Sequence, residues 1–324
     1  MNSISFYTGL IEDEIKSLSL PQNPASLYEP VKYMMDLGGK RIRPVMTMLS
    51  NEMFGGDMKA AIKPALAIEM FHNFTLVHDD IMDHSAIRRG RPTVHEKWNE
   101  ETAILSGDVM LVLAYELLSN VSSDKLHAVL ELFNESAKKV CEGQQLDMIF
   151  ENSEVVTIDT YIDMIARKTG ALFAGSLKMG AIIAGSSAED AENMHGFGLN
   201  AGIAFQVQDD ILDTYGQSGT IGKTIGGDIA SNKKTYLAVK AAETAKGAVL
   251  DELKSLSSNL SIPRESKISR TISIYNALSI KQQAEEAREK YFNLAMENLD
   301  KVNVKEADKQ TLKNVAETLI NREK

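Results

Sequence analysis

Two short acidic segments carry the residue types best suited to chemistry. They are Asp79-Asp80-Ile81-Met82-Asp83 and Asp209-Asp210-Ile211-Leu212-Asp213, and the second nearly copies the first. If both segments are helical, the first and last aspartates of each lie one turn apart on one face. Carboxylates at that spacing repel each other, and a cation held between them relieves the repulsion. We therefore expect metal binding, with two solvated acidic helix faces as the alternative.

The metal that fits best is Mg²⁺. It is a hard cation that takes one or two carboxylates and completes its shell with water and phosphate oxygens. An apolar run precedes each acidic segment (71–77 and 201–207), and a basic loop containing glycine follows each (88–93 and 222–234). Because these surroundings recur together, they favour metal binding over two solvated faces.

The composition predicts an all-helical protein with a sizeable core. The 324 residues are 44% hydrophobic, only 7 are proline, and strand-like alternation is almost absent. No segment rich in proline, glycine and serine separates two cores, so we expect one domain over residues 1–324. The net charge of −10 argues against binding to nucleic acid or to an anionic membrane. An anionic substrate must therefore meet local basic clusters.

The cysteine content and the start of the chain predict a cytoplasmic protein. Cys141 is the single cysteine, so no intrachain disulfide can form, and its apolar neighbours favour a buried, inert thiol. The segment Met1–Leu10 lacks the basic region of a secretory signal. The run Thr169–Ala188 is apolar but contains Lys178 and many small residues, which favours a closely packed helix over a membrane span.

Capping and breaker residues divide the chain into helices. The helix over 103–118 is almost wholly apolar, so we expect it to lie centrally. The last part, 269–324, is expected to form two charged helices in a solvated outer layer. The loop over 215–234 is long and rich in glycine, which is typical of a lid. Further helices are expected over 3–19, 25–38, 64–81, 138–150 and the second acidic segment.

A basic run follows the paired glycines Gly38 and Gly39. It places Lys40, Arg41 and Arg43 within four residues. Glycine lets the backbone approach a ligand, while Lys and Arg side chains suit diphosphate oxygens. The run therefore predicts an anion site, with a solvated basic turn as the alternative.

A second basic run, Arg167-Lys168-Thr169-Gly170, interrupts a helical pattern. Interruption at a glycine predicts a kink whose polar groups face a ligand. On the preceding helix, Gln144 and Asp147 face together, and they either orient a hydrated metal or pair within the core.

His72 and Gln206 each share a helix face with the aspartates that follow them. His72 also forms a Glu-x-x-His pair with Glu69, and Glu192 with His195 forms another. Two such pairs raise a di-iron bundle as an alternative. That site needs two further inward-facing glutamates, and we find none on apolar helix faces.

Taken in order, these motifs resemble the trans-prenyltransferases, the isoprenyl diphosphate synthases that make farnesyl, geranylgeranyl and longer polyprenyl diphosphates. The resemblance covers about residues 25–300 and is specific only as an ordered set. It implies an all-helical bundle around a central apolar pocket, a homodimer, and Mg²⁺ ions, about three of them, bound with the allylic diphosphate. The motifs are Gly38–Pro44, Asp79–Asp83, Arg88–Gly90, Gly143-Gln144 with Asp147, Lys168–Gly170 and Phe205–Asp213.

The resemblance also implies roles for individual residues. The metal ions would bind Asp79, Asp83 and Asp209, with support from Asp80, Asp210 and Asp213. Isopentenyl diphosphate would bind Lys40, Arg43, His72 and Arg89. The allylic diphosphate would bind Arg88, Lys168, Thr169, Gln206, Lys223 and Lys233. Catalysis would depend most on Lys168, Thr169, Gln206, Asp79 and Asp209, and Asp147 would make a water-mediated contact.

Such residues suit the ionisation of an allylic diphosphate. Negative charge grows on the leaving group as a carbocation forms, and metal ions together with Lys and Arg donors neutralise that charge. An apolar pocket keeps water away from the cation. The double bond of isopentenyl diphosphate then attacks in an effectively intramolecular step. Because the released diphosphate can take the proton, no covalent enzyme intermediate is needed.

Two other classes of protein share part of this pattern. A class I terpene cyclase also has a first aspartate cluster, but the all-aspartate second cluster and the pair Arg88-Arg89 argue against it. A non-catalytic subunit of a heteromeric synthase would be expected to lose cluster aspartates, and none is missing.

Product length depends, in the family that the chain resembles, on the residues four and five positions before the first cluster. Here they are Thr75 and Phe74, and Phe71 lies one turn earlier. One aromatic residue beside a small one resembles archaeal geranylgeranyl synthases, with farnesyl and longer products as alternatives. The sequence does not define the primer, the pathway served, or whether Arg322 and Lys324 help to close the site.

Overall fold

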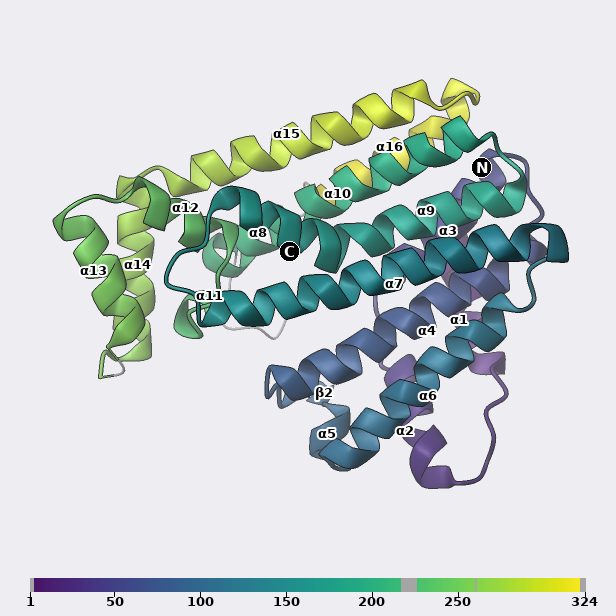
Figure 1. Cartoon of the computed structure of the whole chain (residues 1–324), viewed down its shortest axis with the longest axis horizontal. Helices are drawn as coiled ribbons and strands as arrows, with labels where there is room; N and C mark the ends of the chain where they lie inside the picture. The colour runs from purple at the N-terminus through teal and green to yellow at the C-terminus, as the bar shows by residue number, and fades with distance from the viewer. Residues whose placement is uncertain (1–2, 217–225, 260, 321–324) are drawn as a thin grey trace. The chain divides into compact units, whose positions relative to one another are not determined.

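The computed structural model confirms the all-helical prediction (Figure 1). It describes residues 3–216, 226–259 and 261–320. Contacts divide the chain into two compact units, which are described one at a time below. The first unit contains 1–134, 175–195 and 301–312, and the second contains 135–174, 196–300 and 313–324. A single domain over residues 1–324 and a central apolar pocket stay predictions.

Helix α4 (Met58–Met82) is the centre of the first unit. It packs against α3 (Ile42–Met53) and α6 (Glu100–Leu118), as Figure 1 shows. It begins at Asp57, whose side chain accepts a hydrogen bond from the backbone N–H of Lys59 (2.9 Å). Residues 65–68 are all buried, so neighbouring helices surround this part of α4. The unit also contains α1 (Ile4–Ser17), α2 (Ala25–Asp36), α5 (Val94–Lys97) and the antiparallel strands β1 (Ile87–Arg88) and β2 (Arg91–Pro92).

The apolar run after Thr169 folds as the closely packed helix that the sequence predicts, α9 (Ala171–Ala184). Leu177 and Met179 are fully buried. Ser50 of α3 donates a hydrogen bond from Oγ to the carbonyl oxygen of Leu177 (2.6 Å). Within the described ranges, no helix is long and apolar enough to cross a membrane.

The core of the second unit lies around the C-terminal half of α10 (Ala188–Tyr215). Val207 of α10 is fully buried, in one cluster with residues of α8 (Ile158–Ile165), α12 (Tyr236–Thr244) and α15 (Ile280–Lys301). The clustered residues include Tyr161, Ile165, Leu237 and Ile280. The buried faces of these helices therefore form a single core around the second acidic segment.

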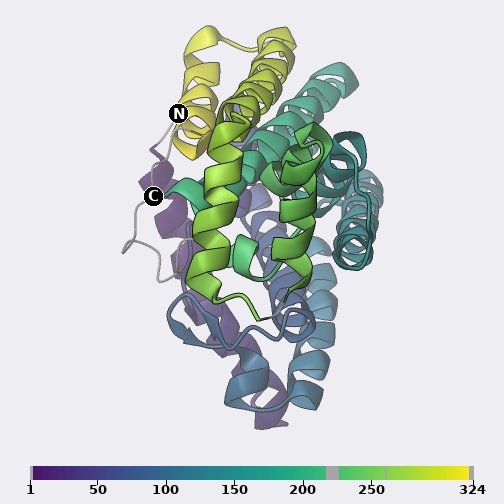
Figure 2. The same ribbon diagram turned by 90° about the vertical axis from the view of Figure 1, so that its left-hand side faces the viewer.

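Helix α14 (Arg264–Ala277) packs against the shorter helices of the second unit. It contacts α11 (Gly227–Ala230), α12 and α13 (Ala248–Ser258). These helices face the viewer, in green, in Figure 2. The remaining helices, α7 (Ser123–Glu151) and α16 (Glu306–Ile320), have residues in both units, as do α9 and α10.

Two expectations about burial were wrong. Cys141 is exposed, because α7 buries the stripe that contains Val140, Asp147 and Phe150, and Cys141 lies beside that stripe. Helix α6 is not covered on all sides, since Leu105 is 59% exposed and Val112 56%. An apolar sequence alone does not distinguish a central helix from one that carries an apolar outer face.

The end of the chain also differs from the expected pair of helices. The segment 269–324 contains α14, α15 and α16, because the chain turns at Ser279 with φ of +54° and again after Lys301. Helix α16 does not belong to a solvated outer layer, because its residues Leu312 and Ala316 are buried.

Candidate functional site

The first acidic segment lies at the C-terminal end of α4. The backbone N–H of Asp83 donates to the carbonyl oxygen of Asp79 (2.8 Å), so these two aspartates occupy successive turns as predicted. Asp79 is half-buried, Asp83 is exposed, and Asp80 between them is buried. This part of the chain therefore presents its first and last carboxylates outward and its middle one inward.

The inward carboxylate of Asp80 is held by Arg88 of β1. The Nε of Arg88 donates to both oxygens of Asp80 (2.9 and 2.8 Å), and its Nη2 lies 2.7 Å from Oδ1. Burial raises the pKa of Asp80, while Arg88 opposes that rise. The positive charge of Arg88 also acts on Asp79 and Asp83. Arg88 is thus a fixed cation of the first acidic cluster, and it holds Asp80 inside the fold. A supporting role of Asp80 in metal binding stays a prediction.

Three further cationic or imidazole groups gather in the same unit. Arg43 of α3 lies with Nη1 3.1 Å from Nε2 of His72 on α4. Arg89 donates from Nη1 to the carbonyl oxygen of Gly38. Burial and the neighbouring charges of Arg43 and Arg89 lower the pKa of His72 well below its usual range, so the ring is neutral at pH 7. Burial also lowers the pKa of Arg43, to about 10.

The paired glycines are needed for this arrangement. Gly39 has φ of +135°, and a Cβ at this position would lie 2.8 Å from Cζ of Arg89. Any side chain there would push the guanidinium of Arg89 away from Gly38. The structure therefore brings together three of the residues predicted to bind isopentenyl diphosphate, Arg43, His72 and Arg89, while Lys40 is exposed beside them.

Within the basic run, Arg41 has a structural role, whereas Lys40 and Arg43 are the residues predicted to bind substrate. Sequence reasoning missed this difference. It is 2% exposed and adopts φ of +48°. Its guanidinium donates to Glu69 (2.7 Å), to Glu12 (2.7 Å) and to the carbonyl oxygen of Met35 (2.6 Å). Because Glu69 is bound to Arg41, its carboxylate is not a ligand for a di-iron centre, in agreement with the rejection of that alternative.

The residues predicted to limit product length lie on α4 before the first acidic segment. The ring of Phe74 packs against Phe71 (5.6 Å between centroids) and against His78 (4.8 Å). Thr75 is half-buried and donates from Oγ1 to the carbonyl oxygen of His72 (2.8 Å). Phe74 therefore belongs to an aromatic cluster on a different face of α4 from Thr75.

The second acidic segment repeats the pattern of the first. Asp209 and Asp213 are half-buried, whereas Asp210 is 3% exposed. The carboxylate of Asp210 accepts hydrogen bonds from the hydroxyl of Tyr161, from the N–H of Tyr236 (2.7 Å) and from Nε2 of Gln206 (3.2 Å). Burial raises the pKa of Asp210 to about 7, and these donors oppose the rise. Asp210, like Asp80, is thus held inside the fold.

A chain of hydrogen bonds joins the second cluster to the predicted kink. Residues Ala166–Gly170 form the π-helix η1, which confirms an interruption at this point. Thr169 donates from Oγ1 to Oε1 of Gln206 (2.9 Å), and Gln206 in turn donates to Asp210. Lys168 donates from Nζ to Oδ2 of Asp147 (2.6 Å). The structure thus connects Thr169, Gln206 and Asp210, and pairs Lys168 with Asp147.

Gly143 allows α7 to approach the π-helix. A Cβ at this position would lie 2.7 Å from Cα of Lys168, closer than packed atoms allow. The same close approach places Asp147, one turn farther along α7, within reach of the Lys168 ammonium. This contact explains why the motif has glycine at 143 and a carboxylate at 147.

The loop after the second cluster is described only in part. Lys223 lies outside the described residues, as do 217–225 altogether and the terminal Arg322 and Lys324. Beyond them, the backbone N–H of Asp228 at the start of α11 donates to Oδ2 of Asp213 (2.9 Å). Lys233 follows α11 and is half-buried.

The arrangement of carboxylates in the two acidic segments fits the way in which Mg²⁺ binds. Among residues 3–216, 226–259 and 261–320, no three His, Cys, Asp or Glu side chains group closely enough to hold a metal by themselves. In each acidic segment the first and last aspartates are half-buried or exposed, while the middle one is buried and bonded to Arg88 or to Tyr236. Mg²⁺ suits such a site, because it takes one or two carboxylates and leaves its other positions to water and phosphate.

Comparison with protein families places this geometry in context. A family model described as polyprenyl synthetase matches residues 24–278. A geranylgeranyl diphosphate synthase of Saccharolobus solfataricus is 39% identical over 332 aligned residues, covering 100% of this chain and 96% of the relative. A short chain isoprenyl diphosphate synthase of Methanothermobacter thermautotrophicus is 36% identical over 324 residues, covering 100% and 98%.

Solved structures are similar over the same extent. The crystal structure of geranylgeranyl pyrophosphate synthetase from Pyrococcus horikoshii superposes with a TM-score of 0.92 at 35% identity, covering 98% of this chain and 97% of that one. The similarity therefore extends over nearly the whole fold.

Proposed function

The chain belongs to the polyprenyl synthetase family, and we propose that it condenses isopentenyl diphosphate with an allylic diphosphate to give a linear all-trans prenyl diphosphate. Geranylgeranyl diphosphate is the product that the relatives favour. The proposal rests on one observation. Arg43, His72 and Arg89 lie close together beside Gly38-Gly39, in the same unit as Asp79 and Asp83. A diphosphate needs just such a set of donors.

In this proposal each group of residues has a distinct task. Arg43 and Arg89 bind the diphosphate of the isopentenyl substrate, and neutral His72 accepts a hydrogen bond that orients Arg43. Lys168, held by Asp147, donates to the allylic diphosphate as negative charge grows there, and Thr169, held by Gln206, lies next to it in the chain and helps to position that diphosphate. Mg²⁺ ions held by Asp79 and Asp83 in the first cluster, and by Asp209 and Asp213 in the second, would supply Lewis-acid stabilisation of the leaving diphosphate.

The direct test is incubation of the purified protein with Mg²⁺, isopentenyl diphosphate and each allylic primer in turn. We expect a linear prenyl diphosphate, identified after phosphatase treatment by chromatography against standards. A cyclic hydrocarbon would instead indicate a terpene cyclase. An absence of turnover with every primer would indicate a non-catalytic subunit, and either result would refute the proposal.

The product length offers a separate prediction. Phe74→Ala removes a ring from the aromatic cluster with Phe71, so the apolar space for the growing chain should lengthen. We expect the main product to gain one or more isoprene units, as measured by reversed-phase chromatography of the alcohols. Phe6→Ala, which truncates a 40% exposed ring of α1, is the control and should leave the product unchanged. An unchanged product with Phe74→Ala would show that this ring does not limit chain length.

We also propose that the protein is a homodimer that buries the apolar outer face of α6. Leu105 and Val112 of α6 are more than half exposed, and Ile104 is 44% exposed. Exposed apolar residues in a row are typical of an interface. Leu105→Asp with Val112→Asp should shift the protein from dimer to monomer in sedimentation velocity, whereas Val249→Asp on α13 should not. A wild-type protein that sediments as a monomer would contradict the proposal.

A further inference from the structure

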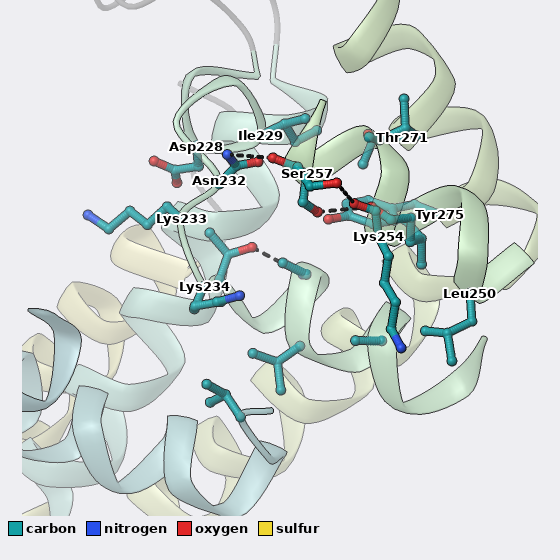
Figure 3. Close-up of a pocket in the computed structure, with 18 of the residues that line it drawn as sticks. Asp228, Ile229, Asn232, Lys233, Lys234, Leu250, Lys254, Ser257, Thr271 and Tyr275 are labelled. Atoms are coloured by element: carbon teal, nitrogen blue, oxygen red, sulfur yellow. Dashed lines mark hydrogen bonds between the residues drawn. The ribbon is translucent and has the colours of Figure 1, made fainter. Parts of the chain in front are cut away.

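The second unit contains a cavity that is lined by Lys233 but by none of the aspartates of the two acidic segments. Its volume is about 730 Å³, within the range of small-molecule sites. It lies between α11, α12, α13, α14 and the segment 154–156 (Figure 3). Because all of its lining belongs to one unit, the cavity can be described without reference to the other.

One wall of the cavity is a polar stripe on α14. Lys267, Thr271 and Tyr275 lie four residues apart, so they share one helix face, and all three line the cavity. Thr271 is 6% exposed and Tyr275 is 3% exposed. Neither hydroxyl forms a hydrogen bond with any residue that the structure describes. Because both residues line the cavity, their hydroxyls can donate to a polar group bound within it.

Lys267 adds a donor to this wall. Its ammonium donates to Oδ1 of Asn232 (2.6 Å) and to the carbonyl oxygen of Ala230 at the end of α11 (3.1 Å). An ammonium has three N–H donors, so one is left for a ligand. The stripe therefore presents two hydroxyls and a cation, which is a set that binds an oxyanion.

The opposite wall is apolar. It is formed by Ala238 and Ala242 of α12 and by Leu250 and Leu253 of α13. At its edges lie Lys234 and Lys254, and neither forms an ion pair with another described residue. Such a wall, with cations at its rim, suits an alkyl or prenyl chain that ends in a negative group.

Three acidic residues also line the cavity, and the charge of one of them, Asp228, reaches the Tyr275 hydroxyl on α14 and contributes to its raised pKa. Glu243 accepts a hydrogen bond from the N–H of Ile158 (2.9 Å) and faces Lys240. Asp228 lies beside Lys233, and Figure 3 shows both side chains directed away from Lys254 and Tyr275. The third, Glu154, lies in the segment at the far edge.

We propose that this cavity binds a linear amphiphilic anion, whose oxyanion head meets the polar stripe on α14 and whose apolar chain lies against α12 and α13. The ligand is defined by its chemistry, an alkyl or prenyl chain with a phosphate or carboxylate head.

Such a ligand would also act on the second acidic cluster, an effect that rests on the proposed function. Lys267 holds the end of α11, and the start of α11 donates to Asp213 through the N–H of Asp228. An anion that draws the Lys267 ammonium away from Ala230 loosens α11 and hence the position of Asp213. Occupancy of the cavity therefore inhibits prenyl transfer.

The binding test uses dodecyl phosphate, below its micelle concentration, titrated into the full-length protein by calorimetry. Ala242→Trp fills the mouth of the cavity at an exposed position, and Lys254→Glu reverses a rim charge. Both should weaken binding at least tenfold, whereas Lys246→Glu, the same charge change at an exposed site outside the lining, should match wild type. Equal affinity in all four proteins, or no saturable heat with wild type, would overturn the proposal.

Two further probes identify the source of the head group. Laurate binding as tightly as dodecyl phosphate would support a site for any lipid anion, and weaker laurate binding would support a phosphate-specific one. Inorganic phosphate binding as tightly as dodecyl phosphate would refute the need for a chain.

Inhibition is measured separately. Dodecyl phosphate should reduce turnover of wild type but not of Ala242→Trp, whose uninhibited activity should equal that of wild type. Equal inhibition of both would place the effect elsewhere and refute the coupling. Calorimetry does not depend on turnover, so a protein that binds the probe but makes no prenyl diphosphate would refute the proposed function alone.

Discussion

Asparagine in place of Asp209 is expected to lower kcat for prenyl transfer about a thousandfold, and Asp79→Asn should have an effect of the same order. Each change removes one negative charge from a cluster that we propose binds Mg²⁺. A bound metal contributes several kcal/mol of charge stabilisation in the transition state, and about 4 kcal/mol corresponds to a factor of a thousand. Incorporation of radiolabelled isopentenyl diphosphate into the prenyl product, followed over a range of Mg²⁺ concentrations, measures the loss.

The Mg²⁺ dependence distinguishes a lost ligand from a general loss of structure. We expect the half-saturating Mg²⁺ concentration to rise in Asp209→Asn while circular dichroism and the unfolding midpoint stay near those of wild type. Asp251→Asn makes the same charge change at an exposed position of α13 and should keep full activity. Asp209→Asn activity within twofold of wild type would remove this residue from the metal site.

Asp210 should respond differently from Asp209, although the two are adjacent. Its carboxylate is buried and bonded to Tyr161, Tyr236 and Gln206, so its loss affects packing as well as charge. The acidic pattern alone does not separate these roles. The pattern does not distinguish the two aspartates. Which of them points inward depends on the side of the helix that other elements cover.

The features of the fold that could be predicted from the sequence are those that depend on residues close together in the chain. Caps, glycines and helical periodicity are properties of neighbouring residues, so α1 and α2 lie close to where they were expected. The interruption at Lys168-Thr169-Gly170 was also readable, because cations and a glycine break an apolar helical pattern. The ordered motifs then identified the family.

Features that depend on distant partners could not be predicted. Nothing near Tyr161 indicates that its hydroxyl reaches Asp210, 49 positions later. Likewise, Arg41 looks like Lys40 and Arg43 in the basic run, and only the approach of Glu69 from α4 shows that it is structural. Exposure of Cys141 and of one face of α6 depends on which neighbours cover a helix, and sequence alone leaves that open.

Arg41→Met is expected to lower the free energy of unfolding by about 3–5 kcal/mol, because it leaves the buried carboxylate of Glu69 without its partner. The side chain of Arg41 is fully buried and that of Glu69 is 3% exposed. Urea-induced unfolding, followed by circular dichroism, measures the change. The protein should also lose affinity for isopentenyl diphosphate, since Arg41 fixes the turn that carries Lys40 and Arg43.

A double-mutant cycle separates the lost ion pair from lost packing. Arg41→Met with Glu69→Met should cost less than the sum of the single changes, because no uncompensated charge is left between the two positions. The control is the pair Lys63 and Glu14, which joins α1 to α4 (2.9 Å) and has side chains 38% and 26% exposed. Lys63→Met should cost about 1 kcal/mol or less. If Arg41→Met costs no more than Lys63→Met, the buried guanidinium of Arg41 does not stabilise the turn that carries Lys40 and Arg43.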